Sequence, residues 1–294
     1  MDKIIVLDFG GQYAHLIANR IRRLGVYSEI KPNDIAPEEL KEFKGIILSG
    51  GPQNISEDDS LKCDQKIFEL GIPVLGICYG HQLISFLCGG KVSRGKTKGY
   101  GKASLAIKNK KGLFEGLKDT ENVWMSHGDY VSRLGKGFEI TASTDDCKTA
   151  AVANFKKNIF GIQFHPEVTH TENGMKILEN FIFKICKCKK NWDMKTFIKN
   201  EIKEIKQKTN SKKVFLLVSG GVDSTVCFAL LNKALGSENV YGLHINNGFV
   251  RENESEDVKR TFEKNGFKNF HVVDASDEFF NALKEVYLPE TKRK

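Results

Sequence analysis

One cysteine stands between two glycines at the end of an apolar run. The segment Gly76-Ile77-Cys78-Tyr79-Gly80 leads into a second apolar run, Leu83–Leu87. Glycines on either side of a residue let the backbone turn tightly between a strand and a helix, as in the Gly-x-Ser-x-Gly turn that lifts a nucleophile above a sheet. At the start of a helix the peptide dipoles favour the thiolate, which is the attacking form of cysteine. Structural cysteines rarely have two turn-forming glycines beside them, so Cys78 is predicted to be a nucleophile.

A second stretch offers the base that a cysteine nucleophile needs. Gly161–Glu167 reads as a strand that ends at His165, with Glu167 two residues further on. The intervening Pro166 stiffens the turn and biases His165 toward extended geometry. His165 is then placed to take the thiol proton while Glu167 holds its other ring nitrogen. We therefore predict a catalytic triad of Cys78, His165 and Glu167.

Attack of a thiolate on a carbonyl group produces an oxyanion, which backbone N–H groups stabilise where no side chain is in the way. The turn Ser49-Gly50-Gly51-Pro52 follows an apolar strand and can present the amide of Gly51. The residue after the nucleophile supplies the second donor in turns of this kind. Gly51 and Tyr79 are therefore the predicted oxyanion donors.

A second candidate site lies at Ser219–Thr225, a turn with two glycines between an apolar strand and a helix. Free amides and the helix dipole at such a turn bind phosphate groups. The turn lacks the lysine of the Gly-x-x-x-x-Gly-Lys-[Ser/Thr] loop, which argues against a kinase or GTPase that transfers a γ-phosphate. The residues predicted to bind a nucleotide are Ser219, Gly220, Gly221, Val222, Asp223, Ser224 and Thr225.

Alternating strands and helices are expected to position the cysteine. The predicted strands are apolar throughout, which favours a parallel sheet covered on both faces. Ligands of such sheets bind at the carboxyl ends of the strands, where the Cys78 turn and the Gly50-Gly51 turn would meet. The strands are Lys3–Asp8, Tyr27–Lys31, Gly45–Ser49 and Val74–Ile77.

The remaining chain divides into further elements. Short β segments in residues 100–164 are expected to extend the sheet as antiparallel strands: Ala103–Ile107, Val123–Ser126, Phe138–Thr144, Ala150–Asn154 and Ile159–Phe164. A helix over Gly174–Cys186 then closes a first domain, 1–188. Residues 189–212 are expected to be a lysine-rich linker and a connecting helix. Residues 213–294 contain strands at Val214–Val218, Val240–Ile245 and Phe270–Asp274, and are few for a doubly wound domain, so that domain is expected to be incomplete.

Composition limits the partners and the compartment. The chain has 294 residues and a formal net charge of +8 at pH 7. Most of the excess lysine lies between Lys184 and Lys213 with acidic residues interspersed, which favours a solvated helix face over a nucleic-acid surface. Seven cysteines, an odd number without an N-terminal signal sequence, indicate a reducing compartment. The N-terminal apolar run is too short to span a bilayer. We therefore predict a cytoplasmic protein that binds neither nucleic acid nor membrane.

Four segments together resemble the class I, or triad, glutamine amidotransferases: Ser49–Pro52, Gly76–Gln82, Trp124–Asp129 and Gly161–Glu167. The Ser-His-Gly-Asp form at 126–129 resembles the amidotransferase of GMP synthetases in particular. In this family the cysteine forms a glutamyl thioester and releases ammonia, and water then regenerates the enzyme. The resemblance implies that glutamine is the substrate and that its pocket is bordered by Gln82, Ser126, Gly128 and Asp129.

The turn at 219–224 resembles the pyrophosphate loop of N-type ATP pyrophosphatases, which cleave ATP between the α and β phosphates and adenylate a substrate. This resemblance implies ATP and Mg²⁺ as cofactors, with Asp223 holding the ion. His244–Arg251 and Pro289–Lys294 resemble further segments of the same family, although Asn246 replaces its usual aspartate. The resemblances imply two α/β domains: a mostly parallel-sheet amidotransferase domain, then an incomplete, doubly wound ATP pyrophosphatase domain.

Both halves together resemble the GMP synthetase family, ligases that use ammonia from glutamine, and ATP, to convert xanthosine 5′-phosphate to GMP. The resemblance implies glutamine, ATP and xanthosine 5′-phosphate as partners and a homodimer for the full-length protein. It also implies an acceptor and dimerisation region beyond this chain. Two alternatives stay open: another glutamine-dependent ligase of the ATP pyrophosphatase type, or a glutaminase or nucleotide-binding fragment without synthetic activity.

Overall fold

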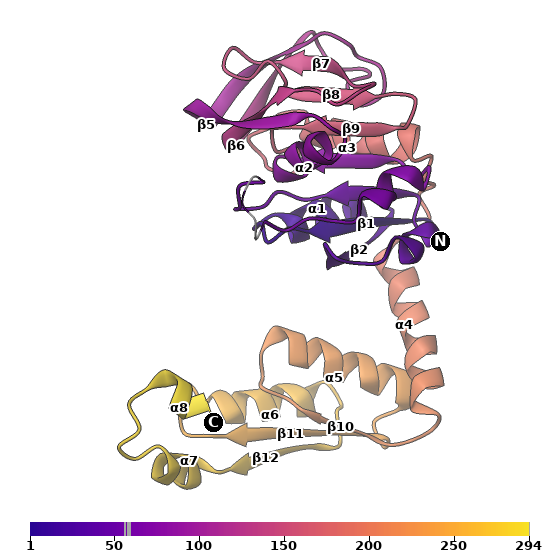
Figure 1. The fold of residues 1–294 in the computed structure, drawn as a ribbon. Helices are drawn as coiled ribbons and strands as arrows, with labels where there is room; N and C mark the ends of the chain where they lie inside the picture. The colour runs from indigo at the N-terminus through magenta and orange to yellow at the C-terminus, as the bar shows by residue number, and fades with distance from the viewer. Residues whose placement is uncertain (56, 58–59, 294) are drawn as a thin grey trace. The chain divides into compact units, whose positions relative to one another are not determined.

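The computed structural model describes residues 1–55, 57 and 60–293 (Figure 1). The chain forms two compact units, Met1–Asp193 and Met194–Lys294. Each unit has its own sheet; the first has two hydrophobic cores, one on each face of its sheet, and the second has one. The prediction of two α/β units is confirmed. None of the helices in the described part of the chain is long and apolar enough to cross a membrane.

The first unit is built on a nine-stranded mixed sheet with strand order β2-β1-β3-β4-β9-β8-β7-β5-β6. Neighbouring strands from β2 to β9 run parallel, as predicted for the first four strands of the chain. Three of these strands are buried along their whole length, because helices cover both faces of the sheet. The parallel strands are β1 (Lys3–Asp8), β2 (Tyr27–Pro32), β3 (Gly45–Leu48), β4 (Val74–Ile77) and β9 (Ile159–Ile162).

Antiparallel strands extend this sheet at one edge, as predicted. The prediction for Ile159–Phe164 is wrong in part, because β9 is antiparallel to β8 but parallel to β4 and so joins the two halves of the sheet. β5 begins at Lys91 instead of Ala103, since its first half is polar and glycine-rich and is held by pairing with β6. The antiparallel strands are β5 (Lys91–Ile107), β6 (Thr120–Arg133), β7 (Glu139–Ser143) and β8 (Ala151–Asn154).

Helices pack on both faces of this sheet. On one face, α1 and α3 share a core with Ile4 and Val6 of β1, and on the other, α2 shares a core with Ile5 and Leu7. Successive residues of a strand point to opposite faces, which explains why β1 contributes to both cores. The helices and short 3₁₀ segments are α1 (Ala14–Arg23), η1 (Pro37–Glu42), η2 (Gln65–Glu69), α2 (Tyr79–Leu87) and α3 (Gly174–Glu179).

The predicted helix over Gly174–Cys186 is not a regular α-helix. α3 continues as a π-helix, η3 (Asn180–Ile185). The wider turn is closed by the amide of Cys186, which donates to the carbonyl of Phe181 at 2.8 Å. The apolar pattern of so short a segment does not distinguish the two kinds of helix, so the sequence predicts a single α-helix.

The second unit has a three-stranded parallel sheet with order β10-β11-β12. Its strands lie within one residue of their predicted bounds: β10 (Val214–Leu217), β11 (Val240–Asn246) and β12 (Phe270–Asp274). Its helices are α4 (Met194–Thr209), α5 (Val222–Leu235), α6 (Glu254–Lys264), α7 (Ser276–Ala282) and α8 (Pro289–Arg293). α5 and α6 cover one face of the sheet through aromatic contacts around Phe228. On the opposite face, Phe215 and Leu217 are 62% and 58% exposed, which fits the predicted incomplete domain.

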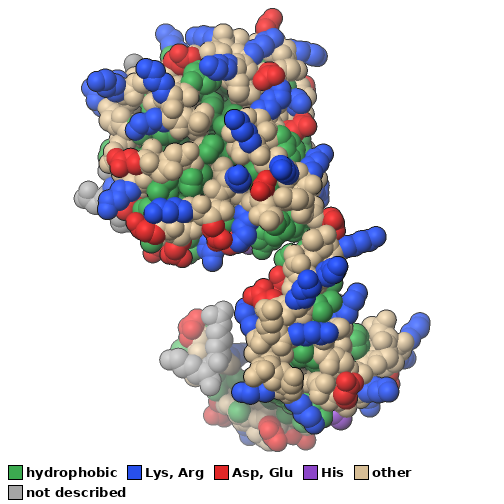
Figure 2. Space-filling model, turned by 90° about the vertical axis from the view of Figure 1, so that its right-hand side faces the viewer, with side chains coloured by type: hydrophobic (Ala, Val, Ile, Leu, Met, Phe, Trp, Pro, Cys, Tyr) green, Lys and Arg blue, Asp and Glu red, His purple; other side chains and the backbone are tan. Residues whose placement is uncertain are grey.

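Charged side chains are spread over the visible surface, and Lys and Arg are interspersed there with Asp and Glu (Figure 2). α4 carries much of the lysine-rich segment and has no buried residue. Lys208 of this helix pairs with Glu204 one turn earlier, at 2.6 Å. α4 is therefore the solvated helix that its composition predicts.

Candidate active site

Cys78 occupies a sharp turn between β4 and α2. Its backbone has φ 53° and ψ −103°, a conformation that is uncommon for a residue with a side chain. The amide of Cys78 donates to the carbonyl of Ile162 at 2.8 Å, which ties the turn to the neighbouring strand β9. Cys78 is 7% exposed. Backbone strain of this kind clusters at functional sites, because the surrounding fold must hold it in place.

The two glycines beside Cys78 are required by packing. A Cβ atom on Gly76 would lie 2.4 Å from the carbonyl oxygen of Gly80. A Cβ atom on Gly80 would lie 2.3 Å from the carbonyl oxygen of Leu48 on β3. The start of α2 therefore approaches the sheet more closely than any residue with a side chain allows.

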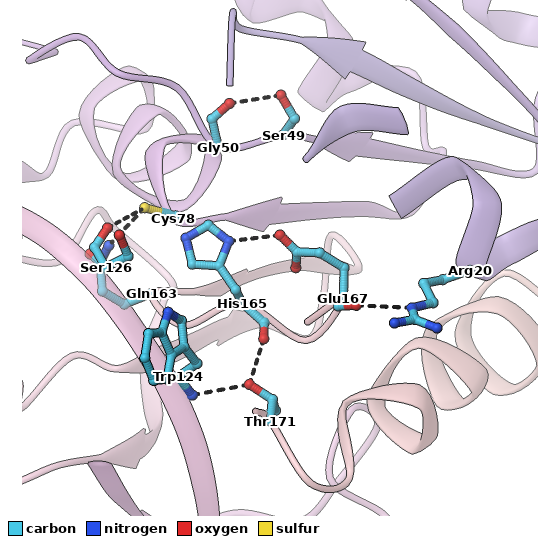
Figure 3. Close-up of polar contacts among 10 residues, drawn as sticks. All are labelled: Arg20, Ser49, Gly50, Cys78, Trp124, Ser126, Gln163, His165, Glu167 and Thr171. Atoms are coloured by element: carbon cyan, nitrogen blue, oxygen red, sulfur yellow. Dashed lines mark hydrogen bonds and ion pairs between the residues drawn. The ribbon is translucent and has the colours of Figure 1, made fainter. Parts of the chain in front are cut away.

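His165 follows β9 and lies between Cys78 and Glu167 (Figure 3). Nδ1 of His165 donates to Oε1 of Glu167 at 2.7 Å, and the two residues are 4% and 1% exposed. The backbone carbonyl of Glu167 accepts from Nε of Arg20 on α1 at 2.9 Å. The structure thus brings the three residues of the predicted triad together, although they are 87 and 2 positions apart in the chain.

The backbone of His165 is held by β6. Its amide donates to the carbonyl of Trp124 at 3.0 Å, and its carbonyl accepts from the hydroxyl of Thr171. That hydroxyl also accepts from the amide of Trp124 at 3.0 Å. The three hydrogen bonds form a closed loop that holds the backbone of His165 in place, and Figure 3 shows the two that Thr171 makes.

The pKa of His165 is raised. Burial lowers this pKa, but hydrogen bonds with Cys78 and Glu167 and the negative charges of both raise it from 6.5 to about 10. The second carboxylate oxygen of Glu167 is buried and has no hydrogen-bond partner among the described residues. Its charge is therefore compensated chiefly by the imidazolium, so the buried carboxylate favours the protonated form of His165.

Gln163 is a further site residue, and the sequence patterns do not predict it. Its side-chain amide donates to Sγ of Cys78 at 3.7 Å, and its carbonyl oxygen accepts from Gln82 at 3.2 Å. The sulfur also lies 3.5 Å from the carbonyl oxygen of Ser126. A signal for Gln163 exists in the sequence, because it lies two residues before His165 on an extended segment, and such side chains share a face.

A pocket of about 450 Å³ opens at Cys78. It is of the size that binds small molecules. Glu57 and Arg94 also line the pocket, and the sequence does not predict them. Arg94 lies opposite Asp129 in the register of β5 and β6, in the polar first half of β5. Burial raises the pKa of Asp129, and the charge of Arg94 opposes this rise. The predicted residues that line the pocket are Gly51, Tyr79, Gln82, Ser126, Gly128 and Asp129.

The predicted nucleotide-binding residues lie at the turn from β10 to α5 in the second unit. The hydroxyl of Ser219 accepts from the amide of Gly221 at 3.3 Å and contacts the hydroxyl of Ser224 at 3.0 Å. Gly220 has φ +84°, a conformation that favours glycine. The turn leads into a helix of 14 residues, whose first amides are available for phosphate groups.

A pocket of about 470 Å³ lies beside this turn. Gly220, Val222 and Thr225 line it together with residues of α6, whereas the other four predicted residues are not among its described lining residues. Asp223 is an exposed carboxylate in the first turn of α5. The described residues contain no group of three or more His, Cys, Asp or Glu side chains that could hold a metal ion. A single carboxylate fits Mg²⁺ that is bound mainly by phosphate oxygens.

Comparison with known proteins follows the division into two units. Residues 5–185 match the family model of class-I glutamine amidotransferases, and residues 193–292 match that of NAD synthase. Curated relatives include glutamine-hydrolyzing GMP synthases of Brachyspira hyodysenteriae, 48% identical, and Bacillus cereus, 46% identical. Each alignment covers 100% of this chain and 57% of the relative. The chain therefore spans little more than half the length of these relatives.

A solved structure from Thermoplasma acidophilum, named provisionally as part of a GMP synthase, is 38% identical, with a TM-score of 0.60. The match covers 64% of this chain and 94% of that one. Together these matches confirm a GMP synthase-like chain, with an amidotransferase unit followed by part of an ATP pyrophosphatase unit. Since the amidotransferase model covers more than half of the sequence, this chain belongs to the class-I glutamine amidotransferase family.

Proposed function

We propose that this chain is the glutamine-hydrolysing part of a GMP synthase. The observation that carries the proposal is the arrangement around Cys78. The backbone of Cys78 is strained, Oε1 of Glu167 lies 2.7 Å from Nδ1 of His165, and a pocket opens at Cys78. Family membership supports amide hydrolysis, and the names of the relatives support GMP as the final product.

In the first half of the proposed reaction, glutamine binds in the pocket at Cys78. The thiolate attacks the carbonyl carbon of the side-chain amide, and the amides of Gly51 and Tyr79 donate hydrogen bonds to the oxyanion. The C–N bond then breaks while His165 gives its proton to the nitrogen. Ammonia leaves, and a glutamyl thioester remains on Cys78.

In the second half of the reaction, His165 changes from acid to base. The thioester carries no negative charge on sulfur, so one of the two partners that raise the pKa of His165 is lost. The neutral ring takes a proton from water as the water oxygen attacks the thioester carbonyl. The C–S bond breaks, glutamate leaves, and the thiolate and the imidazolium are restored.

We propose that the ammonia reacts with an acceptor activated at the second unit. ATP binds at Ser219–Thr225, adenylates the C2 oxygen of xanthosine 5′-phosphate and releases pyrophosphate; ammonia then displaces AMP to form GMP. Mg²⁺ at Asp223 would shield the charge of the phosphate oxygens. The acceptor site and the homodimer belong to the full-length protein, in keeping with the part of the relatives that this chain does not span.

A glutaminase assay of this chain, with and without ATP and xanthosine 5′-phosphate, tests the proposal. We expect glutamate and ammonia from glutamine and no GMP. Cys78→Ala should abolish glutamate release, whereas Cys227→Ala, at an exposed cysteine of the second unit, should retain it. Glutamate release by Cys78→Ala would rule out Cys78 as the nucleophile, and formation of GMP would rule out the proposed division of the activity.

A second candidate is another glutamine-dependent ligase, which is favoured by the match of residues 193–292 to NAD synthase. Both candidates use the Ser219–Thr225 turn for ATP. Asp223→Ala should therefore abolish ATP-dependent turnover by the full-length protein and leave glutamine hydrolysis largely intact in either case. AMP release that requires xanthosine 5′-phosphate would favour GMP synthesis, and AMP release with a different acceptor would favour the second candidate.

A further inference from the structure

A second pocket, of about 310 Å³, reaches Cys78 from the turn that follows β1. This turn, Gly10–Tyr13, forms one part of its lining, and His165 forms another. Four residues belong to both this pocket and the glutamine pocket: Gly51, Pro52, Cys78 and Ser126. The two pockets therefore meet at the nucleophile.

The two pockets differ in the site residues that line them besides Cys78. Among the described lining residues, His165 belongs only to the second pocket, whereas Gln82 and Asp129 belong only to the glutamine pocket. Cys78 thus stands between a chamber that holds the predicted substrate-binding residues and a chamber that holds the base.

This difference matters most after the thioester has formed. The glutamyl chain then fills the glutamine pocket up to the sulfur, so water cannot follow the same route to the carbonyl carbon. Water must also approach where His165 can take its proton. Since Nδ1 of His165 is bound to Glu167, the proton goes to Nε2. Both requirements point to the second pocket.

We propose that the pocket at Gly10–Tyr13 is the port through which ammonia leaves and water reaches the glutamyl thioester. The inference rests on the proposed glutaminase function. At this port the water oxygen bonds to the carbonyl carbon, the C–S bond breaks, and the proton passes to Nε2 of His165. Ammonia takes the same path outward one step earlier, because His165 protonates it.

Two side chains define the port. The ring of Tyr13 stands edge-on to the imidazole of His165, with ring centroids 5.4 Å apart and an interplanar angle of 73°. Gln12 lines the pocket but is exposed, which places it at the mouth. Neither side chain belongs to the glutamine pocket. A larger residue at position 12 would therefore narrow the port and leave the substrate site intact.

Competition between hydroxylamine and water tests the port. Both attack the thioester, and hydroxylamine yields γ-glutamyl hydroxamate in place of glutamate. The ratio of these products does not depend on the amount of folded enzyme or on the rate of thioester formation. Hydroxylamine has one more heavy atom than water, so Gln12→Trp should lower the hydroxamate-to-glutamate ratio by about tenfold, the discrimination that a tight pocket achieves for one additional group.

Two further variants complete the test. His15→Trp adds the same bulk at an exposed position of α1 outside the pocket, and it should leave the ratio at the wild-type value. Tyr13→Ala widens the port and should raise the hydroxamate-to-glutamate ratio. If Gln12→Trp does not fold, the ratio of Tyr13→Ala tests the port by itself. An unchanged ratio in the variants that still release glutamate would overturn the port. Absence of both products from the wild-type chain would instead overturn the proposed glutaminase function.

Discussion

The imidazole of His165 and the carboxylate of Glu167 share a hydrogen bond of 2.7 Å in a buried setting. Glu167→Gln keeps the shape of the side chain and removes its charge, so the pKa of His165 should fall. We expect kcat for glutamine hydrolysis to fall by about 10²- to 10⁴-fold, the usual contribution of acid–base catalysis. KM should change little, because Glu167 does not line the glutamine pocket. Steady-state glutaminase kinetics and an NMR titration of the imidazole measure both effects.

A matched control for this substitution exists on the surface of the same unit. Glu179 on α3 pairs with Lys176 at 3.0 Å, and both side chains are about two-fifths exposed. Glu179→Gln makes the same chemical change in a surface ion pair, which contributes little to stability, and it should leave kcat at the wild-type value. Equal kcat values for the two variants would show that Glu167 does not orient His165.

The same raised pKa connects the stability of the first unit to pH. His165 keeps its proton in the folded protein up to about pH 10, whereas an unperturbed histidine loses it near 6.5. At His165 the folded state therefore binds more protons than the unfolded state between these two values. The stabilisation by His165 should be complete below pH 6.5 and should be lost as the pH rises toward 10. Urea unfolding across this range should show a smaller loss of stability in His165→Gln than in the wild-type protein, and parallel curves would contradict the link.

Among the elements, the turn from β10 to α5 depends on glycine at position 220. A Cβ atom there would lie 2.7 Å from Cγ2 of Val258 on α6, at a φ of +84°. Gly220→Ala should therefore lower the unfolding free energy of the second unit by about 1–3 kcal/mol, the usual effect of overpacking. Gly221→Ala is the matched control, because φ is −69° and the nearest atom would be Oγ of Ser219 at 3.4 Å. Urea unfolding should separate the two variants, and equal losses would contradict the steric argument.

Elements with a regular apolar pattern could be predicted from the sequence, because a strand buried on both faces must be apolar throughout. β4 is of this kind, and it is present as predicted. The glycines on either side of Cys78 form the predicted tight turn. The first half of β5 could not be found in this way, since residues 91–102 are polar and glycine-rich and form a strand only by pairing with β6. Arg94 was missed with it. Local patterns do not encode pairing between distant segments.

For the molecule as a whole, the first unit is expected to fold and to hydrolyse glutamine without the second. Every residue assigned to glutamine hydrolysis lies in Met1–Asp193, which has two hydrophobic cores of its own. The Thermoplasma acidophilum structure aligns over 94% of its length with 64% of this chain, so a protein close in size to this unit exists as a separate chain.

A fragment of residues 1–193 should therefore unfold cooperatively on heating, as followed by circular dichroism, and should retain the glutaminase activity of the 294-residue chain. The Cys78→Ala form of the fragment provides the inactive, folded control. A fragment that unfolds cooperatively but has lost activity would show that residues 194–294 contribute to the hydrolytic site, contrary to the assignment of that site to the first unit alone.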